Sequence, residues 1–88
     1  MTTHCITVDG AVWAHRRTLE DARRDAVTHG AWHTAVGRDP VHPQLPNASR
    51  YRVESYVWDV ASRKYILTAT EVIEVERDRD KARAIVGI

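Results

Sequence analysis

The stretch YRVESYVWDVASRKYILTATEVIEVE, residues 51–76, alternates β-branched or aromatic side chains with polar ones on both sides of a short break. Such alternation is typical of half-buried strands, so the stretch predicts a long antiparallel hairpin. A loop between Asp59 and Lys64 sets these two residues opposite each other. The same register places Arg52 opposite Glu71, which is an independent second pair of opposite charges.

This register divides the predicted hairpin into two faces of different character. The face suited to pack under a helix is rich in β-branched residues and comprises Tyr51, Val53, Ser55, Val57, Ile66, Thr68, Thr70 and Val72. The other face is charged at one end and aromatic at the other, and comprises Arg52, Glu54, Tyr56, Trp58, Tyr65, Leu67, Ala69 and Glu71.

A second hairpin is predicted near the start of the chain, over roughly residues 3–8 and 11–16. Asp9-Gly10 lies between two β-rich runs, and this pair favours a two-residue turn because both of its positions need positive φ. The turn sets Ile6 opposite Trp13, Val8 opposite Ala11, and His4 opposite His15 on one face. The alternative is a single long strand with a bulge at Gly10.

The edges of the predicted sheet differ in their protection. Charged side chains blunt a free strand edge, and Glu71, Glu74 and Glu76 could do so in the second hairpin. Residues 3–8 carry no such charges. We therefore expect residues 3–8 to be a free edge that could pair with a second copy and form a homodimer.

The segment TLEDARRDAVTHG, residues 18–30, predicts the main helix. Thr18 is suited to cap its first turn, with an acidic residue three positions later at Asp21. Gly30 is expected to end it, because glycine adopts the left-handed conformation of a helix stop. The apolar stripe is narrow and comprises Leu19, Ala22, Ala26 and Val27.

Residues 31–50 contain all three prolines and predict a long connection without regular structure. Near the C-terminus, Asp78 or Asp80 could cap a short final helix. The expected fold is therefore α+β: a small two-layer domain over residues 1–88, with an antiparallel sheet of two hairpins and one main helix.

Composition limits the classes of function. The 13 basic and 12 acidic side chains nearly cancel and interleave, which argues against a protein that binds nucleic acid or anionic membranes through charge alone. Arginine greatly outnumbers lysine, which is typical of a GC-rich bacterium or its phage. Cys5 has no disulfide partner, and no leader or membrane span is evident, so we expect a cytoplasmic protein.

The aromatic end of the second hairpin needs a cover, because small monomers rarely expose such a cluster. The long connection could fold back over it with Trp32, Val41 or Leu45. A second copy or another protein could cover it instead, and a small-molecule cleft is the third alternative.

We expect a non-catalytic protein-binding module, a homodimer acting as a regulator, an accessory subunit or a phage-type inhibitor. Its predicted contact residues are Tyr56, Trp58, Tyr65 and Leu67, with Arg52 and Arg63 at the rim.

Other chemistry has weaker support in the sequence. The alternative function is a nucleic-acid-binding regulator that uses an arginine-lined hairpin and helix edge. Its contact residues would be Arg16, Arg17, Arg23 and Arg24, although acidic residues lie among them.

For a metal site, the weak candidates are His29, His33 and His42, but a helix stop at Gly30 would separate the first two. We therefore predict no metal and no cofactor.

No catalytic pattern is evident. Cys5 and His15 would point to opposite faces of the sheet in the predicted register, so they could not act as nucleophile and base. The serines lack the glycine context of a nucleophile elbow, and no phosphate-binding loop is present. We therefore expect no enzymatic activity.

Overall fold

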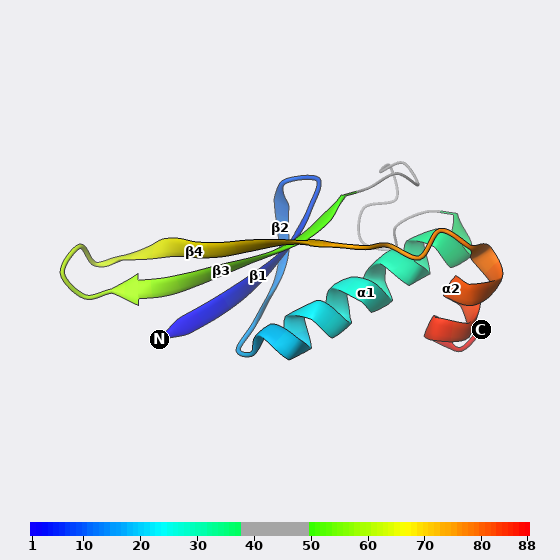
Figure 1. The fold of residues 1–88 in the computed structure, drawn as a ribbon, viewed down its shortest axis with the longest axis horizontal. Helices are drawn as coiled ribbons and strands as arrows, with labels where there is room; N and C mark the ends of the chain where they lie inside the picture. The colour runs from blue at the N-terminus through cyan, green and yellow to red at the C-terminus, as the bar shows by residue number, and fades with distance from the viewer. Residues whose placement is uncertain (38–49) are drawn as a thin grey trace.

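A computed structural model describes residues 1–37 and 50–88 of the chain (Figure 1). It is an α+β fold in which a four-stranded antiparallel sheet packs against one main helix, with a short helix at the C-terminus, as expected. The elements are β1 (Thr2–Val8), β2 (Ala11–Arg16), α1 (Leu19–Val36), β3 (Tyr51–Asp59), β4 (Lys64–Ile73) and α2 (Arg79–Val86).

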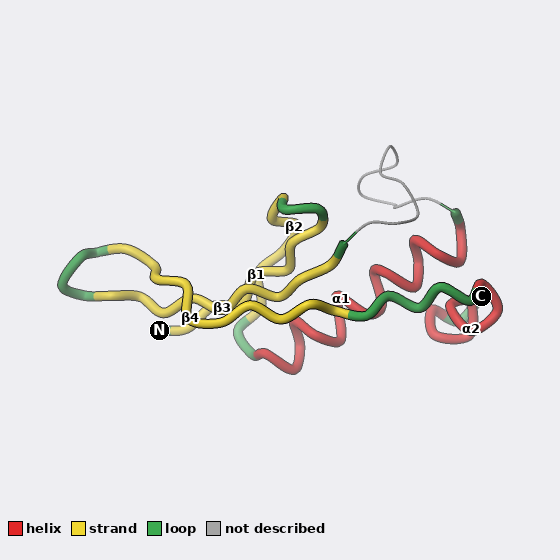
Figure 2. Tube along the Cα trace, turned by 45° about the horizontal axis from the view of Figure 1, so that its top comes forward, coloured by secondary structure: helices red, strands yellow, loops and turns green. Residues whose placement is uncertain are grey.

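The strand order is β2-β1-β3-β4, so β1 is an inner strand (Figure 2). It pairs with β3 from Thr2 opposite Val57 to Val8 opposite Tyr51. The prediction that residues 3–8 form a free edge is therefore wrong. Burial explains the order, because β1 contains Ile6 and other residues that need cover on both sides.

The first hairpin turns at Asp9 and Gly10, whose φ angles are 50° and 87°. The predicted turn and the pair Val8–Ala11 are confirmed. Farther from the turn the register shifts, because β2 contains one extra residue, Trp13. The predicted pairs Ile6–Trp13 and His4–His15 are therefore wrong, and the observed pairs are Ile6–Ala14, Cys5–His15 and His4–Arg16.

The bulge at Trp13 has a packing cause. The indole of Trp13 stacks on the imidazole of His29 in α1, with ring centroids 4.1 Å apart. The extra residue lets both Trp13 and Ala14 pack against the core while the strand keeps pairing with β1. His4, which loses its predicted partner, instead bonds the Ser55 hydroxyl through Nδ1 at 2.7 Å.

The second hairpin shows the same behaviour. Near the loop the predicted pair Asp59–Lys64 is confirmed, and beyond Thr68 the register shifts by one. Thr68 is the extra residue, and its hydroxyl donates to the carbonyl oxygen of Ser55 at 3.1 Å. The predicted pair Arg52–Glu71 is therefore wrong, because Arg52 lies opposite Val72.

Helix α1 begins as predicted, since the Thr18 side chain accepts from the Asp21 amide at 3.1 Å. The predicted stop at Gly30 is wrong, because α1 continues to Val36 and ends at Gly37, where φ is 75°. A Cβ at Gly30 would lie 3.1 Å from both Val75 methyl carbons. The absence of a side chain at Gly30 lets Val75 pack directly against the helix. The residues next to Gly30 in the sequence give no sign of this contact.

The predicted connection over residues 31–50 is accordingly wrong for residues 31–36, which are helical. Residues 38–49 lie outside the described chain, and so do Val41, Leu45 and His42. At the C-terminus, the predicted helix is confirmed, with Asp78 as its cap accepting from the Lys81 amide at 3.0 Å.

The core lies between α1 and one end of the sheet. Ile6, Val8, Tyr51 and Val53 are at most 1% exposed there, under Ala22 and Ala26. Alanine side chains are small, so the backbone of the helix can lie close to that of the sheet. We call this end of the sheet, comprising residues 51–55 and 69–73 with the strand segments beside them, the base. A second cluster joins the far half of α1 to α2 through Ala31, Ala35, Ala82 and Val86.

The far end of the β3–β4 hairpin, residues 56–67, extends past α1, and we call it the arm. In Figure 1 the arm lies at the left and α1 runs from the middle of the molecule to α2 at the right. The molecule is correspondingly elongated, at 48 × 24 × 17 Å. In the chain as described, neither helix is long and apolar enough to cross a membrane.

Candidate protein-binding surface

The predicted contact residues of the arm lie together on the sheet face opposite α1. Trp58 is paired with Tyr65, and Tyr56 with Leu67, across the two strands. The rings of Trp58 and Tyr65 meet edge to face, with centroids 5.1 Å apart. Trp58 is 39% exposed, Tyr65 44% and Leu67 48%. The rings support one another, yet more than a third of each side chain remains exposed.

The arm is also apolar on its other face, which the sequence analysis assigned to the space under the helix. Val57 and Ile66 are paired there, and they are 38% and 44% exposed. They fall beyond the reach of α1. The sequence did indicate that the helix covers little of the sheet. Its apolar stripe is narrow, so it can cover only a short length of sheet.

Of the two predicted rim residues, the structure brings only Arg63 to the arm. Arg63 lies in its loop with φ at 53° and is exposed. Arg52 lies in the base, opposite Val72, and is separated from the aromatic rings along the strand. The register shift does not change its face, but its place along β3 removes it from the arm.

A hollow of about 330 Å³ opens on the same face beside the arm. Its walls are mainly apolar, which suits an apolar group from a partner. The residues that line it are Thr3, Cys5, Val12, His15, Tyr56 and Tyr65.

Cys5 and His15, which line this hollow, lie on the same face of the sheet, so the prediction that they point to opposite faces is wrong. Cys5 Sγ lies 3.2 Å from His15 Nδ1, because the bulge in β2 brings both residues to one face. Burial, and secondarily the carboxylate of Glu54, raise the pKa of the Cys5 thiol above its ordinary value. The thiol is therefore protonated at neutral pH and is a poor nucleophile.

The Glu54 carboxylate also acts on the phenol of Tyr56. Loss of solvation raises the Tyr56 pKa, and the nearby charge of Glu54 adds to this effect. Cys5 and Tyr56, which both line the hollow, thus stay neutral over the physiological pH range. A neutral surface favours apolar contact over ionic recognition.

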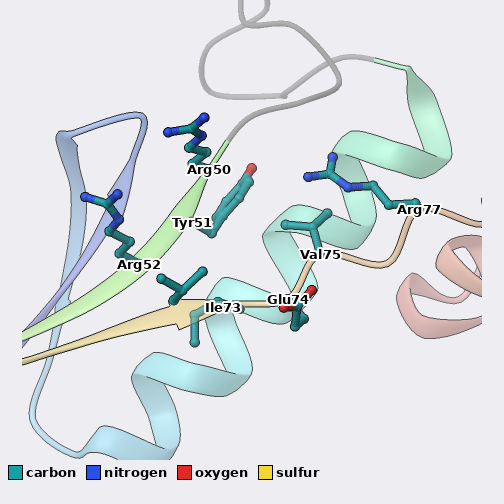
Figure 3. Close-up of a pocket in the computed structure, with 8 residues that line it drawn as sticks. Arg50, Tyr51, Arg52, Ile73, Glu74, Val75 and Arg77 are labelled. Atoms are coloured by element: carbon teal, nitrogen blue, oxygen red, sulfur yellow. The ribbon is translucent and has the colours of Figure 1, made fainter.

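The base carries two arginine-lined pockets. One of about 310 Å³ lies between the start of β3 and the segment after β4 (Figure 3). Figure 3 shows Arg50 and Arg52 on one side of Tyr51 and Arg77 on the other, with Glu74 nearby. A neighbouring pocket of about 360 Å³ is lined by Asp9, Gly10, Arg50 and Arg52. The carboxylates offset part of this positive charge.

The four arginines predicted to contact nucleic acid do not form one uncompensated patch. Arg16 bonds Asp25 at 2.5 Å, and Arg24 bonds Asp21 at 2.5 Å. Arg23 donates to both oxygens of Glu71, at 2.6 and 2.7 Å. Arg17 has no ion pair within residues 1–37 and 50–88. Three of the four charges are thus already neutralised at short range.

His29 and His33 share the continuous helix α1, contrary to the expectation that Gly30 would separate them, and both are buried. His29 Nδ1 lies 2.8 Å from the Tyr51 hydroxyl, so it joins the core. Neither ring nitrogen of His33 has a hydrogen-bond partner in the described part of the chain. No group of three metal-binding side chains occurs within those same residues.

Comparison of the chain with known protein families, curated proteins and solved structures finds no match. We therefore infer the function from the geometry of this molecule. Its most distinctive surface is the arm, with apolar side chains exposed on both faces.

Proposed function

We propose that the protein is a small non-catalytic protein-binding module whose contact surface is the arm. The observation that carries the proposal is the exposure of Trp58, Tyr65 and Leu67 on one face of the arm and of Val57 and Ile66 on the other. Thr2 and Thr3 of β1 pair with the inner end of the arm, but among the described residues the rest of it is a two-stranded ribbon, and such a ribbon is marginal in water. A partner that covers its apolar side chains stabilises it.

The arm has the properties of an interface hot spot. Tryptophan and tyrosine are enriched in such sites because each buries roughly 150–250 Å². The edge-to-face contact between Trp58 and Tyr65 holds both rings in place before binding. Less conformational freedom is then lost when a partner docks. The hollow beside Tyr65 adds a place for an apolar side chain of the partner.

The electrostatics favour a protein partner over nucleic acid. Nucleic-acid binding needs uncompensated positive charge, whereas Arg16, Arg23 and Arg24 are each engaged by a carboxylate. The raised pKa of Cys5 likewise favours a binding role over catalysis at its contact with His15. We further propose a cytoplasmic regulator, accessory subunit or inhibitor, since a single reduced cysteine fits that compartment.

The test is capture of proteins from a lysate of the native host by the wild type, by Trp58→Ala and by a matched control, Ile85→Ala. Ile85 is 46% exposed but lies in α2, away from the arm. We expect Trp58→Ala to lose the partner while its circular dichroism spectrum is unchanged, and Ile85→Ala to keep the partner.

Equal capture by Trp58→Ala and the wild type would contradict the proposal. Capture of nucleic acid that weakens steeply as salt rises would support the alternative, a nucleic-acid-binding regulator. Repeating the capture at low and moderate salt therefore separates the two functions.

A further inference from the structure

The free edge of β4 is the most exposed segment of the sheet. Among residues 1–37 and 50–88, β4 is an outermost strand that pairs only with β3, and residues 64–70 are all exposed. The strand contains no proline, so its backbone N–H groups are available for pairing along the edge. Such an edge is a template for another strand.

The bulge at Thr68 determines which residues of β4 share a face. Before it, Lys64 and Ile66 lie on the helix side, opposite Asp59 and Val57. After it, Glu71 lies on the helix side, opposite Val53. Because of this bulge, an antiparallel pairing that sets the arm half of one β4 strand against the base half of another matches their faces when Lys64 lies opposite Glu71.

One such register pairs opposite charges. With a two-fold axis between Leu67 and Thr68, Lys64 lies opposite Glu71 of the second copy, and Ile66 lies opposite Ala69. Each pair falls on one face of the sheet. Sliding the strands by two positions would instead set Lys64 against Ala69 or Ile73, and the charge pairing would be lost.

The features that usually protect an edge are matched in this register. A lysine and a bulge on an edge strand normally discourage pairing. Here the lysine meets a carboxylate, and the two bulges meet next to the axis. Glu71 already accepts from Arg23, yet a carboxylate has further lone pairs for a lysine. The edge at β2 is shorter, at six residues, and also bulged.

We infer that the protein is a homodimer in which the β4 strands of two copies pair antiparallel, with Lys64 opposite Glu71 of the second copy. The two sheets then form one continuous sheet with both α1 helices on the same side. The inference rests on the proposed role of the arm as a binding surface and names a second copy as the occupant of its edge. Trp58, on β3, stays available for another protein.

The test is the mass of the purified protein by sedimentation equilibrium over a range of concentrations. Each chain has a mass of 10.0 kDa, so the wild type should approach about twice that value. Lys64→Glu should lower the mass to that of a monomer. Lys64→Glu with Glu71→Lys should restore the dimer, because the exchanged charges again face each other.

The matched control is Lys81→Glu, which makes the same charge change at an exposed residue of α2 and should leave the dimer intact. Circular dichroism verifies that each variant folds. A monomeric wild type, a dimer that persists in Lys64→Glu, or a double variant that stays monomeric would each overturn the inference. Lysate capture tests the arm separately, so a monomer that still captures a protein through Trp58 would leave the proposed function standing.

Discussion

The base and the arm belong to the same hairpin and contain similar residues, but their burial is opposite. In β3, Val53 is 1% exposed and Val57 38%. Among the tyrosines, Tyr51 is 1% exposed and Tyr65 44%. The difference shows that strand composition selects residues that fit a pleated surface, whereas the position of the helix decides which of them become core.

The helix position follows from the chain order. α1 begins at Leu19, directly after β2, and crosses the base before it continues to α2 (Figures 1 and 2). Within the described residues, the start of β1 reaches the arm, where Thr2 and Thr3 pair with Val57 and Tyr56, but α1 does not. The arm therefore lacks the cover of a helix, and the base is the region that packs against α1.

The largest expected effect is at Tyr51, whose replacement by alanine should destabilise the protein by about 3–5 kcal/mol. Its ring fills the base, and its hydroxyl is 2.8 Å from His29 Nδ1. Chemical denaturation measures the loss. Tyr51→Phe keeps the ring and removes only the hydrogen bond, so it should cost about 1 kcal/mol. Near-wild-type stability of Tyr51→Ala would mean that the base is not the core.

An intermediate effect is expected at Gly30, where the helix lies against Val75. Leucine at this position has no room, since even a Cβ would lie 3.1 Å from two methyl carbons. We expect Gly30→Leu to lower the free energy of unfolding by about 1–3 kcal/mol. In Gly30→Ala, the gain of about 1 kcal/mol in helix propensity opposes the tight contact, so its change should be much smaller. If Gly30→Leu matches the wild type in denaturation, the packing against Val75 is wrong.

The smallest effect is expected at the exposed pair Arg23–Glu71, which ties the helix to β4. Hydrogen bonds from Arg23 hold the pKa of the Glu71 carboxyl below its ordinary value. The pair therefore adds stability at neutral pH, and this contribution is lost as the pH falls through the lowered pKa. Solvent screening keeps it small.

The stability difference between wild type and Glu71→Gln should accordingly be slight at pH 7 and vanish in acid. Urea denaturation over a pH series measures it. The control is Glu71→Gln made in an Arg23→Gln background, where the guanidinium that lowers the pKa of Glu71 is gone and the pH dependence of the difference should be lost. A stability difference between wild type and Glu71→Gln that grows as the pH falls would contradict the stabilising role of the Arg23–Glu71 pair.

Local signals in the sequence predicted most of the fold. The Asp9-Gly10 turn, the Thr18 cap and the Asp78 cap are each set by a few neighbouring residues, and all three are confirmed. The face shared by Tyr56, Trp58, Tyr65 and Leu67 also followed, because period-two alternation holds near a tight loop.

The errors have a common origin in contacts between distant segments. The first bulge accompanies the packing of Trp13 on His29, and the approach of Val75 explains a glycine inside the helix. The inner position of β1 comes from burial of Ile6. None of these contacts leaves a mark in the neighbouring sequence, so the Cys5–His15 contact, which the first bulge creates, was not foreseen.

Comparing Val53→Ala with Val57→Ala in chemical denaturation tests most directly whether the base is the core and the arm is a binding surface. Both valines lie in β3 on the same face, so the loss of strand propensity is common to the two variants. If the arm serves binding and the base holds the fold, Val53→Ala should cost about 2 kcal/mol and Val57→Ala less than about half of that. Equal costs for the two variants would show that the arm is part of the core, and the proposed binding surface would be wrong.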